Sequence, residues 1–345
     1  MNCQLAVVPK QLHFKSPAGT SRGVYTTRQV WYIQVTSSDY PGRVGIGECA
    51  PLPQLSCDDY PDYEERLRAI CRSVEQHDGV YDAESLRAFP SMLFGLETAF
   101  LHLTKGRLAL FDTPFSRGEQ GIPINGLIWM GHYREMLAQI EKKVAENYRC
   151  IKLKIGAIAF EQELDLLRHI RSAFSAKEIE LRVDANGAFE PHVALDRLKQ
   201  LSEFDLHSIE QPIRAGQWEE MARLTELSPL PIAFDEELIG WHTWEQKGNL
   251  LDALHPHYIV LKPSLHGGMR GSAEWIRAAE QRNIGWWITS ALESNVGLNA
   301  IAQWCATYPN LMPQGLGTGL LFTDNIDLPL EIRKDCLWYG TADHE

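Results

Sequence analysis

The stretch CIKLKIGAIAFEQELDLLRHIRSAFSAKEIELRVDANG, at residues 150–187, is the part of the sequence that decides the fold. It contains two short apolar runs, separated by a segment that is compatible with a helix. The first run ends at Lys154 and the second at Asp184, and a glycine follows each within three residues. A strand, a helix and a second strand in this order predict two parallel strands joined by a crossover helix.

Units of similar length continue along the chain after Gly121. Their apolar runs are PINGLI, CIKLKIG, IELRVDANG, LHSIEQP, LPIAFDE, YIVLKPS, GWWITSALES and MPQGLGTG. From the second run onward, the run ends are 25 to 30 residues apart, at Lys154, Asp184, Glu210, Asp235, Lys262, Ser290 and Leu316. This length suffices for a strand, a helix and two short loops. Eight such units predict an α/β fold with a TIM-like barrel, and an open, doubly wound sheet is the alternative.

The first 120 residues have a different texture. Short runs rich in Val, Ile and aromatic residues predict strands, and apolar residues at helical spacing predict helices. The predicted elements are three strands and two helices, at 4–14, 29–37, 43–51, 60–76 and 91–103. Gly and Pro interrupt the segment before Gly121, and a domain boundary is expected there. The sequence therefore predicts an α+β domain at residues 1–120 and a barrel after it.

The charge and cysteine content disfavour several function classes. Asp and Glu outnumber Lys and Arg by 45 to 33, and the resulting net charge of −12 repels a nucleic-acid backbone. The seven cysteines include no C-x-x-C pair, so neither a disulfide framework nor a thiolate zinc site is predicted. No run of 18 apolar residues occurs, and the N-terminus lacks a signal-peptide pattern. We expect a cytoplasmic protein that binds neither nucleic acid nor membranes; no oligomeric state can be predicted.

Three acidic residues end three consecutive predicted strands, namely Asp184, Glu210 and Asp235. Neighbouring strands lie about 4.8 Å apart, so these side chains can converge at the carboxyl end of a barrel. Three carboxylates in one pocket repel each other unless a cation lies between them. Ligands that are all oxygen favour a hard cation such as Mg²⁺. The alternative is that each acid caps a following helix or pairs with a basic residue.

Lysines end the strands on either side of these acids. Lys152 and Lys154 are two residues apart and share one face of their strand, and Lys262 ends the sixth strand. Burial beside a dication lowers the pKa of a lysine, which makes the amine a base near neutral pH. The alternative is a solvated surface charge. A divalent metal between two basic lysines suits abstraction of a proton α to a carboxylate.

Five short motifs resemble the muconate-lactonising branch of the enolase superfamily: KLKIG at 152–156, DANGAF at 184–189, IEQP at 209–212, FDEE at 234–237 and LKPS at 261–264. The resemblance covers essentially the whole chain. It implies a (β/α)7β barrel at residues 121–325 with the N-terminal α+β domain as a cap. It further implies that a C-terminal tail, 326–345, returns to the cap.

The resemblance also implies the roles of the site residues. The Mg²⁺ ligands would be Asp184, Glu210 and Asp235, with Mn²⁺ able to replace Mg²⁺. Glu236 or Glu237 could in principle take the place of Asp235, although the motif register favours Asp235. The catalytic lysines would be Lys154 and Lys262. The supporting residues, which orient ligands or lysines, would be Lys152, Asn186 and Glu236.

Four further stretches resemble the members of this branch that form o-succinylbenzoate: VGIGECAPLPQLS at 44–56, INGLIWMG at 124–131, SALESNVGL at 290–298 and GLGTGLLF at 315–322. They imply dehydration of 2-succinyl-6-hydroxy-2,4-cyclohexadiene-1-carboxylate, a step of menaquinone biosynthesis. Candidates for binding the succinyl tail of this small-molecule carboxylate are Ser290, Gly317 and Gly319. For each stretch a structural explanation is open, such as a glycine turn or a helix cap at Ser290 or Ser294.

The same scaffold supports other activities. An N-acylamino acid racemase or dipeptide epimerase would use the same metal and the same two lysines. A dipeptide epimerase would carry Asp-x-Asp near the last strand ends, where this chain has SALESNVG. This difference disfavours the dipeptide epimerase and leaves the N-succinylamino acid racemase open. Muconate cycloisomerase is a more distant one. A binding protein without turnover would lack a metal ligand or a lysine, and every expected position is filled.

Overall fold

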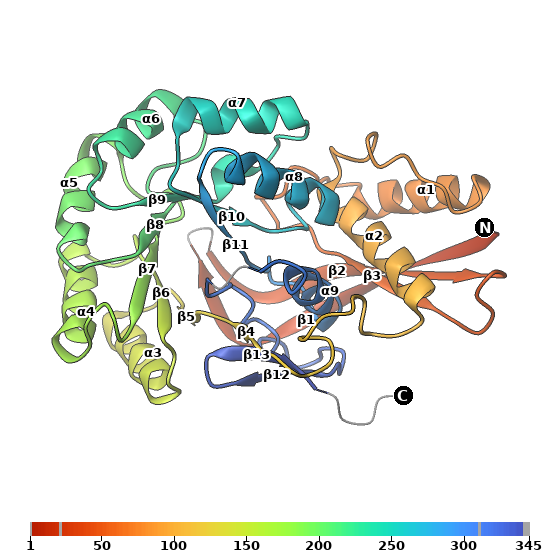
Figure 1. Ribbon diagram of the computed structural model, residues 1–345, viewed down its shortest axis with the longest axis horizontal. Coiled ribbons are helices and arrows are strands. Elements are labelled where there is room, and N and C mark those ends of the chain that lie inside the picture. The colour runs from red at the N-terminus through yellow and green to blue at the C-terminus, as the bar shows by residue number, and fades with distance from the viewer. Residues whose placement is uncertain (1, 21–22, 310–311, 341–345) are drawn as a thin grey trace.

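The computed structural model describes residues 2–20, 23–309 and 312–340 (Figure 1). At the N-terminus, β1 (Cys3–Thr20), β2 (Gly23–Ser37) and β3 (Gly45–Cys49) form an antiparallel sheet in that order. The predicted helices follow as α1 (Tyr63–Gln76) and α2 (Pro90–Lys105). The apolar side of α1 places Leu67 and Val74 in a core shared with this sheet. The strands and helices predicted for this region are therefore present.

A parallel sheet forms the centre of the remaining chain. Its strands run in the order β11-β10-β9-β8-β7-β6-β5, so that strands adjacent in sequence are neighbours in space. The strands are β5 (Gly126–Ile128), β6 (Cys150–Lys154), β7 (Glu180–Asp184), β8 (Ser208–Glu210), β9 (Ile232–Phe234), β10 (Tyr258–Leu261) and β11 (Gly285–Ile288). Nearly all of their residues are buried, as in parallel sheets that are covered by helices.

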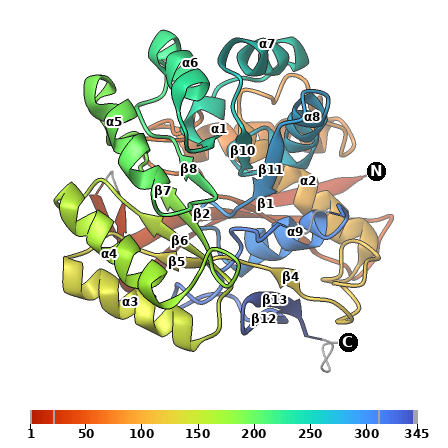
Figure 2. The ribbon, with the colours of Figure 1, turned by 60° about the vertical axis from the view of Figure 1, so that its left-hand side comes forward.

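Helices alternate with these strands and lie along the outside of the sheet (Figure 2). They are α3 (Tyr133–Ala145), α4 (Phe160–Ala173), α5 (Pro191–Ser202), α6 (Trp218–Leu227), α7 (Trp244–Leu254), α8 (Gly268–Glu280) and α9 (Asn295–Cys305). A short 3-10 turn, η1 (Glu236–Leu238), interrupts the connection between β9 and α7. The α/β class predicted from the repeated units is confirmed, with a curved parallel sheet inside an arc of helices.

The eighth predicted strand is reduced to two bridges. Gln314 forms a parallel bridge with Ile124, and Gly315 forms one with Thr289, so this short segment contacts both sides of the sheet. Pro313 cannot donate a backbone hydrogen bond, and glycine weakens a strand. A side chain at Gly315 would have no room, because its Cβ would lie 2.1 Å from Thr289 Oγ1. These residues explain why a regular strand does not form.

A further small sheet lies beside the parallel one. β4 (Ile122–Pro123) pairs with β13 (Cys336–Tyr339), which pairs with β12 (Leu330–Arg333). In the segment of the chain that precedes β12, the carbonyl oxygen of Leu321 accepts a hydrogen bond from the backbone N–H of Lys15 in β1. No helix among the described residues is long and apolar enough to span a membrane.

Buried Glu48 of β3 connects the N-terminal region to the start of α9. Its carboxylate accepts hydrogen bonds from the backbone N–H groups of Ser294 and Gly297, both at 2.8 Å, and from the Ser294 hydroxyl. Ser294 is the N-cap of α9 and also accepts from the N–H of Val296. The helix-cap explanation of the SALES segment is therefore confirmed for Ser294. Burial raises the pKa of Glu48 to about 7.

We predict that Glu48 makes stability depend on pH. Its ordinary pKa is 4.5, so between pH 4.5 and about 7 the folded state binds more protons than the unfolded state. The stability that Glu48 contributes is complete below this window and is lost as the pH rises through it. The Glu48→Gln variant does not titrate. Its free energy of unfolding, measured by urea denaturation, should therefore be lower than that of the wild type by a margin that shrinks by a few kcal/mol from pH 4.5 to pH 8.

The matched control is Glu226→Gln, at an exposed position of α6. It should follow the wild type at every pH. A difference between wild type and Glu48→Gln that stays constant over this range would contradict the assignment.

Candidate active site

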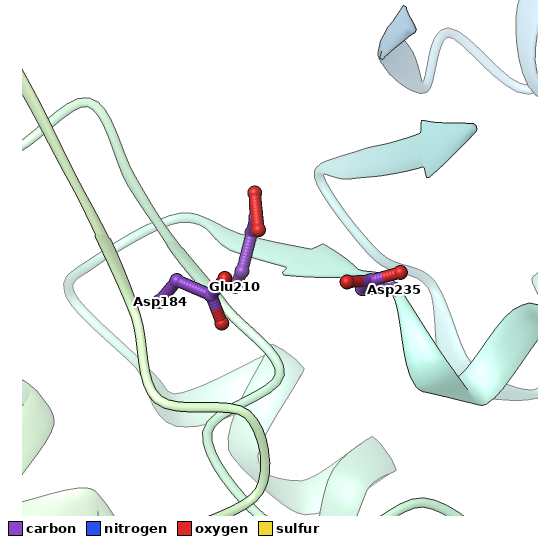
Figure 3. Close-up of side chains that lie close together, drawn as sticks. All are labelled: Asp184, Glu210 and Asp235. Atoms are coloured by element: carbon purple, nitrogen blue, oxygen red, sulfur yellow. The ribbon is translucent and has the colours of Figure 1, made fainter. Parts of the chain in front are cut away.

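Three buried carboxylates meet at the carboxyl ends of neighbouring strands. Asp184 and Glu210 are the last residues of β7 and β8, and Asp235 directly follows β9. One oxygen of each lies within 4.8 Å of the others, and each residue is at most 1% exposed. Figure 3 shows Asp184 and Glu210 together, with Asp235 across from them. The convergence expected from the spacing of the motifs is therefore observed.

Lysines lie on both sides of this acid triad, which we define as Asp184, Glu210 and Asp235. Lys154 ends β6, and its Nζ lies 2.9 Å from Asp184 Oδ2. Lys262 follows β10, and its Nζ lies 2.6 Å from Asp235 Oδ1. Five adjacent strands, β6 to β10, therefore carry Lys, Asp, Glu, Asp and Lys in this order at their carboxyl ends.

The other lysine of the K-x-K pair contacts the centre of the triad. Lys152 Nζ donates to both carboxylate oxygens of Glu210 at 2.7 Å and lies 3.3 Å from Asp184 Oδ2. Each acid is thus paired with a lysine, as in the ion-pair alternative for these residues. These lysines are also mostly buried, which excludes the solvated surface charge as their explanation.

Asn186 and Glu236 form a hydrogen-bonded chain that ends at Lys154. Lys154 Nζ donates to Asn186 Oδ1 at 2.7 Å, and Asn186 Nδ2 donates to Glu236 Oε1 at 3.0 Å. Asn186 has a left-handed backbone, with φ of 43°, and its N–H donates to Asp184 Oδ1. The turn after β7 therefore aims the amide of Asn186 at the lysine. This geometry supports an orienting role for both residues.

The carboxylates favour the charged form of Lys152 and Lys262. Burial alone would lower the pKa of Lys262, but the negative charges of Asp235 and Glu236 raise it above its ordinary value. Glu210 and Asp184 likewise outweigh burial and raise the pKa of Lys152. Burial favours the neutral form of Asp184, yet the nearby ammonium groups of Lys154 and Lys152 lower its pKa. The sequence predicts a lowered lysine pKa only where a cation lies beside the amine. The carboxylates have the reverse effect, and they raise the pKa of Lys152 and of Lys262.

The acid triad fits a divalent cation. Oxygens bound to one Mg²⁺ at about 2.1 Å lie roughly 3–4 Å apart, so a small inward movement would complete such a site. Within the described ranges, the acid triad is the only group of three potential ligands that converge in this way. Among the described residues this group includes Asp235 and neither Glu236 nor Glu237. One oxygen of Glu237 instead accepts from the N–H of Gly216 at 2.9 Å.

The predicted tail-binding residues come together at the closing segment of the sheet. Ser290 lies just beyond β11, and its hydroxyl is 2.6 Å from the Thr318 hydroxyl. Thr318 is flanked by Gly317 and Gly319, and a Cβ on Gly317 would lie 3.5 Å from Ile124. Only the neighbourhood of these residues is thereby established, and their role in binding a substrate stays a prediction.

Two residues in this region were not found from the sequence. His266 Nδ1 accepts a hydrogen bond from the backbone N–H of Lys262 at 3.0 Å. Arg28 of β2 is buried and donates to the carbonyl oxygens of Ala50 at 2.6 Å and Leu292 at 3.3 Å. It thus joins the N-terminal region to the loop after β11. Both act through backbone groups, which leave no motif in a sequence.

The family described as enolase C-terminal domain-like matches residues 135–338. The o-succinylbenzoate synthase of Desulfotalea psychrophila is 47% identical, over 95% of this chain and 97% of that protein. The crystal structure of MenC from this organism aligns with a TM-score of 0.85 and 43% identity, covering 98% of this chain and 100% of that chain. The o-succinylbenzoate synthase of Geobacillus stearothermophilus is 35% identical, over 83% and 76% of the two chains. Muconate lactonizing enzyme from Pseudomonas fluorescens shares the fold, with a TM-score of 0.82 and 24% identity over 97% and 93%.

We predict that a divalent cation stabilises the folded protein through the acid triad. Mn²⁺ at about one hundred times its Kd should raise the free energy of unfolding by about 2.7 kcal/mol over a sample in EDTA. Thermal unfolding followed by circular dichroism measures this shift. Asp235→Asn should remove most of it, because one ligand charge is lost. Asp252→Asn, which only breaks a surface ion pair with Arg282, should keep it. Equal shifts in the two variants would place the cation elsewhere.

Proposed function

Because the chain belongs to the enolase C-terminal domain-like family of the enolase superfamily, and is an enzyme similar to o-succinylbenzoate synthases, we propose its reaction. It is the Mg²⁺-dependent dehydration of 2-succinyl-6-hydroxy-2,4-cyclohexadiene-1-carboxylate to o-succinylbenzoate, in menaquinone biosynthesis. One observation carries this proposal. Five adjacent strand ends place Lys154 and Lys262 on opposite sides of three carboxylates, an arrangement that suits abstraction of a proton α to a carboxylate.

The finer architecture is part of the same proposal. We assign residues 121–325 to a (β/α)7β barrel, and the bridges of Gln314 and Gly315 to the two sides of the sheet support its closure. Residues 1–120 form the cap, supported by a separate hydrophobic core that includes Leu67 and Leu96. Residues 326–345 form the tail, which returns to the cap. In support, its described part pairs with β4 at the start of the barrel, and the ring of Tyr339 lies 6.0 Å from that of Phe115 in the cap.

The acid triad would hold the metal, with Mg²⁺ preferred and Mn²⁺ able to replace it. Bound there, the ion would supply positive charge that holds the ring carboxylate and stabilises negative charge on its oxygens. The lysines transfer the proton and stabilise the negative charge of the ring, and neighbouring groups orient them. Lys152, between Glu210 and Asp184, offsets carboxylate charge at the centre of the site.

Lys154 acts first as base and then as acid. Its neutral amine takes the proton from the ring carbon that bears the carboxylate. The electrons of the broken C–H bond form the new ring double bond as the neighbouring C–O bond breaks. The Lys154 ammonium returns its proton to the departing hydroxide, so water leaves and the amine is neutral again. The chain through Asn186 and Glu236 keeps Lys154 aimed at the reacting carbon.

Lys262 stays an ammonium throughout the reaction. The carboxylate of Asp235 favours its charged form, and the positive charge stabilises the electron-rich ring from the opposite side. The succinyl tail extends toward Ser290 and the backbone amides of Gly317 and Gly319, which can bind a carboxylate. The substrate is therefore a small dicarboxylate. A cytoplasmic location is consistent with the absence of a disulfide among the seven cysteines, all within the described ranges.

The first experiment is an ultraviolet assay with the cyclohexadiene carboxylate. Its conjugated diene absorbs and disappears as o-succinylbenzoate forms, so turnover is followed directly. We predict rapid loss of absorbance that needs Mg²⁺, stops after chelation with EDTA and returns when Mg²⁺ or Mn²⁺ is added. Turnover that survives exhaustive chelation would refute the metal assignment. A folded, metal-bound protein that leaves the diene intact would refute the synthase, and N-succinylamino acid racemisation would be tested in its place.

We predict that the two lysines are separately essential. Lys154→Ala and Lys262→Ala should each lower kcat by about 10²–10⁴-fold, because each removes a group that acts in the transition state. Steady-state kinetics with Mg²⁺ present measures the loss. Lys199→Ala, on the exposed surface of α5, is the control and should retain full activity. A fully active Lys154→Ala variant would exclude Lys154 as the base.

A further inference from the structure

Gln211 lies next to a candidate metal ligand and is completely buried. It follows Glu210 at the end of β8 and has 0% exposure. Its backbone φ is 38°, in the left-handed region that residues other than glycine and asparagine rarely adopt. A polar residue held in such a conformation without access to water needs partners for every polar atom of its side chain.

Both polar atoms of the Gln211 side-chain amide have hydrogen-bond partners. Its Oε1 accepts from the backbone N–H groups of Asp235 at 3.3 Å and Glu237 at 3.2 Å. Its Nε2 donates to the carbonyl oxygen of Ile213 at 3.0 Å and to Glu237 Oε2 at 3.1 Å. A primary amide has two donor hydrogens and two acceptor lone pairs, so its hydrogen-bonding capacity is used in full.

These bonds join the loops that carry the acid triad. The carbonyl oxygen of Gln211 accepts from the N–H of Gly187 at 2.7 Å, which fixes the turn after β7. The N–H of Gln211 donates to Ala233 of β9 at 2.9 Å. Its side chain then holds the N–H of Asp235, whose own side chain makes no capping bond to η1. One residue thus connects the backbones that position Asp184, Glu210 and Asp235.

Glu237 holds the amide of Gln211 in this orientation. It is buried, and its second oxygen accepts from the N–H of Gly216 in the loop after β8. If the amide were flipped, its NH₂ group would face two N–H donors, and its oxygen would face the Glu237 carboxylate. The hydrogen-bond pattern therefore allows one orientation, the one that supports Asp235.

We propose that Gln211 is a positioning residue that sets the affinity of the acid triad for its divalent cation, with Glu237 as its partner. The inference rests on the proposed metal site. Gln211 contacts the backbone of Asp235, and its four side-chain hydrogen bonds are all to protein groups. Partners of this kind around metal sites typically change metal affinity by about 10–100-fold when they are replaced.

The test is the Kd for Mn²⁺, measured by isothermal titration calorimetry on the full chain without substrate. Gln211→Met keeps the volume and removes all four hydrogen bonds. We expect it to bind Mn²⁺ about 10–100-fold more weakly than the wild type. The matched control is Gln314→Met, at another buried glutamine whose amide also bridges the backbone, between Ile288 and Met312. It should lose thermal stability but keep the wild-type Kd.

An exchange of charge provides a second test, which applies even where Gln211→Met does not fold. Gln211→Glu alone places a carboxylate against the carboxylate of Glu237 and should disrupt the pair. Adding Glu237→Gln restores one donor and one acceptor between the two positions, with the net charge of the wild type. The exchange does not restore the bond to the carbonyl oxygen of Ile213, because a carboxylate cannot donate to it. We therefore expect the double variant to bind Mn²⁺ more tightly than Gln211→Glu, and more weakly than the wild type.

The outcomes separate the inference from the function on which it rests. A wild type that binds no Mn²⁺ would refute the metal site itself. A wild type that binds Mn²⁺, together with a Gln211→Met variant of unchanged Kd, would overturn the role of Gln211 alone. A double variant no better than Gln211→Glu would overturn the pairing with Glu237.

Discussion

The structure of the site depends on the cost of placing three carboxylates where water does not reach them. Asp184, Glu210 and Asp235 are almost completely buried, and charges in such surroundings need compensation at short range. Lys152, Lys154 and Lys262 supply it, and the six side chains carry no net charge when all are ionised. A dication entering this balanced set adds two positive charges, which favours loss of a proton from a lysine. The arrangement that stabilises the acids would thus also couple binding of the proposed metal to the appearance of the proposed base.

The N-terminal region is attached to the parallel sheet and its helices through two carboxyl groups of its own, one buried and one partly buried. Glu48 of β3 accepts from the first N–H groups of α9, and Glu97 of α2 accepts from the N–H of Met269 in α8 at 2.6 Å. A carboxylate is stabilised at the positive end of a helix dipole. Both helices follow strands at the Lys262 side of the site. The N-terminal region is therefore attached to the helices that follow β10 and β11, the last two strands of the parallel sheet.

The sequence predicts the strand ends that recur at regular spacing. It does not predict an irregular strand or a contact that occurs only once. The spacing of Lys154, Asp184, Glu210, Asp235 and Lys262 was enough to place them at one edge of a parallel sheet, because each ends a buried run. The eighth strand was expected as a regular one, since MPQGLGTG has the right position, but proline and glycines reduce it to two bridges. The roles of Gln211 and Arg28 rest on bonds from side chains to backbone groups as many as 264 residues away. Such bonds depend on which backbone groups the fold brings near the side chain, so no pattern of residue types in the sequence predicts them.

The two lysines of the site are not equivalent, and this difference favours one-base chemistry. Racemisation requires each of two lysines to give and take a proton, whereas dehydration requires a single lysine that serves as base and then as acid. Lys262 is held by both oxygens of Asp235, and the pKa of its ammonium is raised by this contact. Lys154 shares its contacts between one oxygen of Asp184 and the neutral amide of Asn186. A neutral amide does not stabilise an ammonium as a carboxylate does. Lys262 therefore has the closer carboxylate pairing of the two, which suits the role of fixed positive charge proposed for it, and Lys154 has the mixed contacts that suit the role proposed for the base.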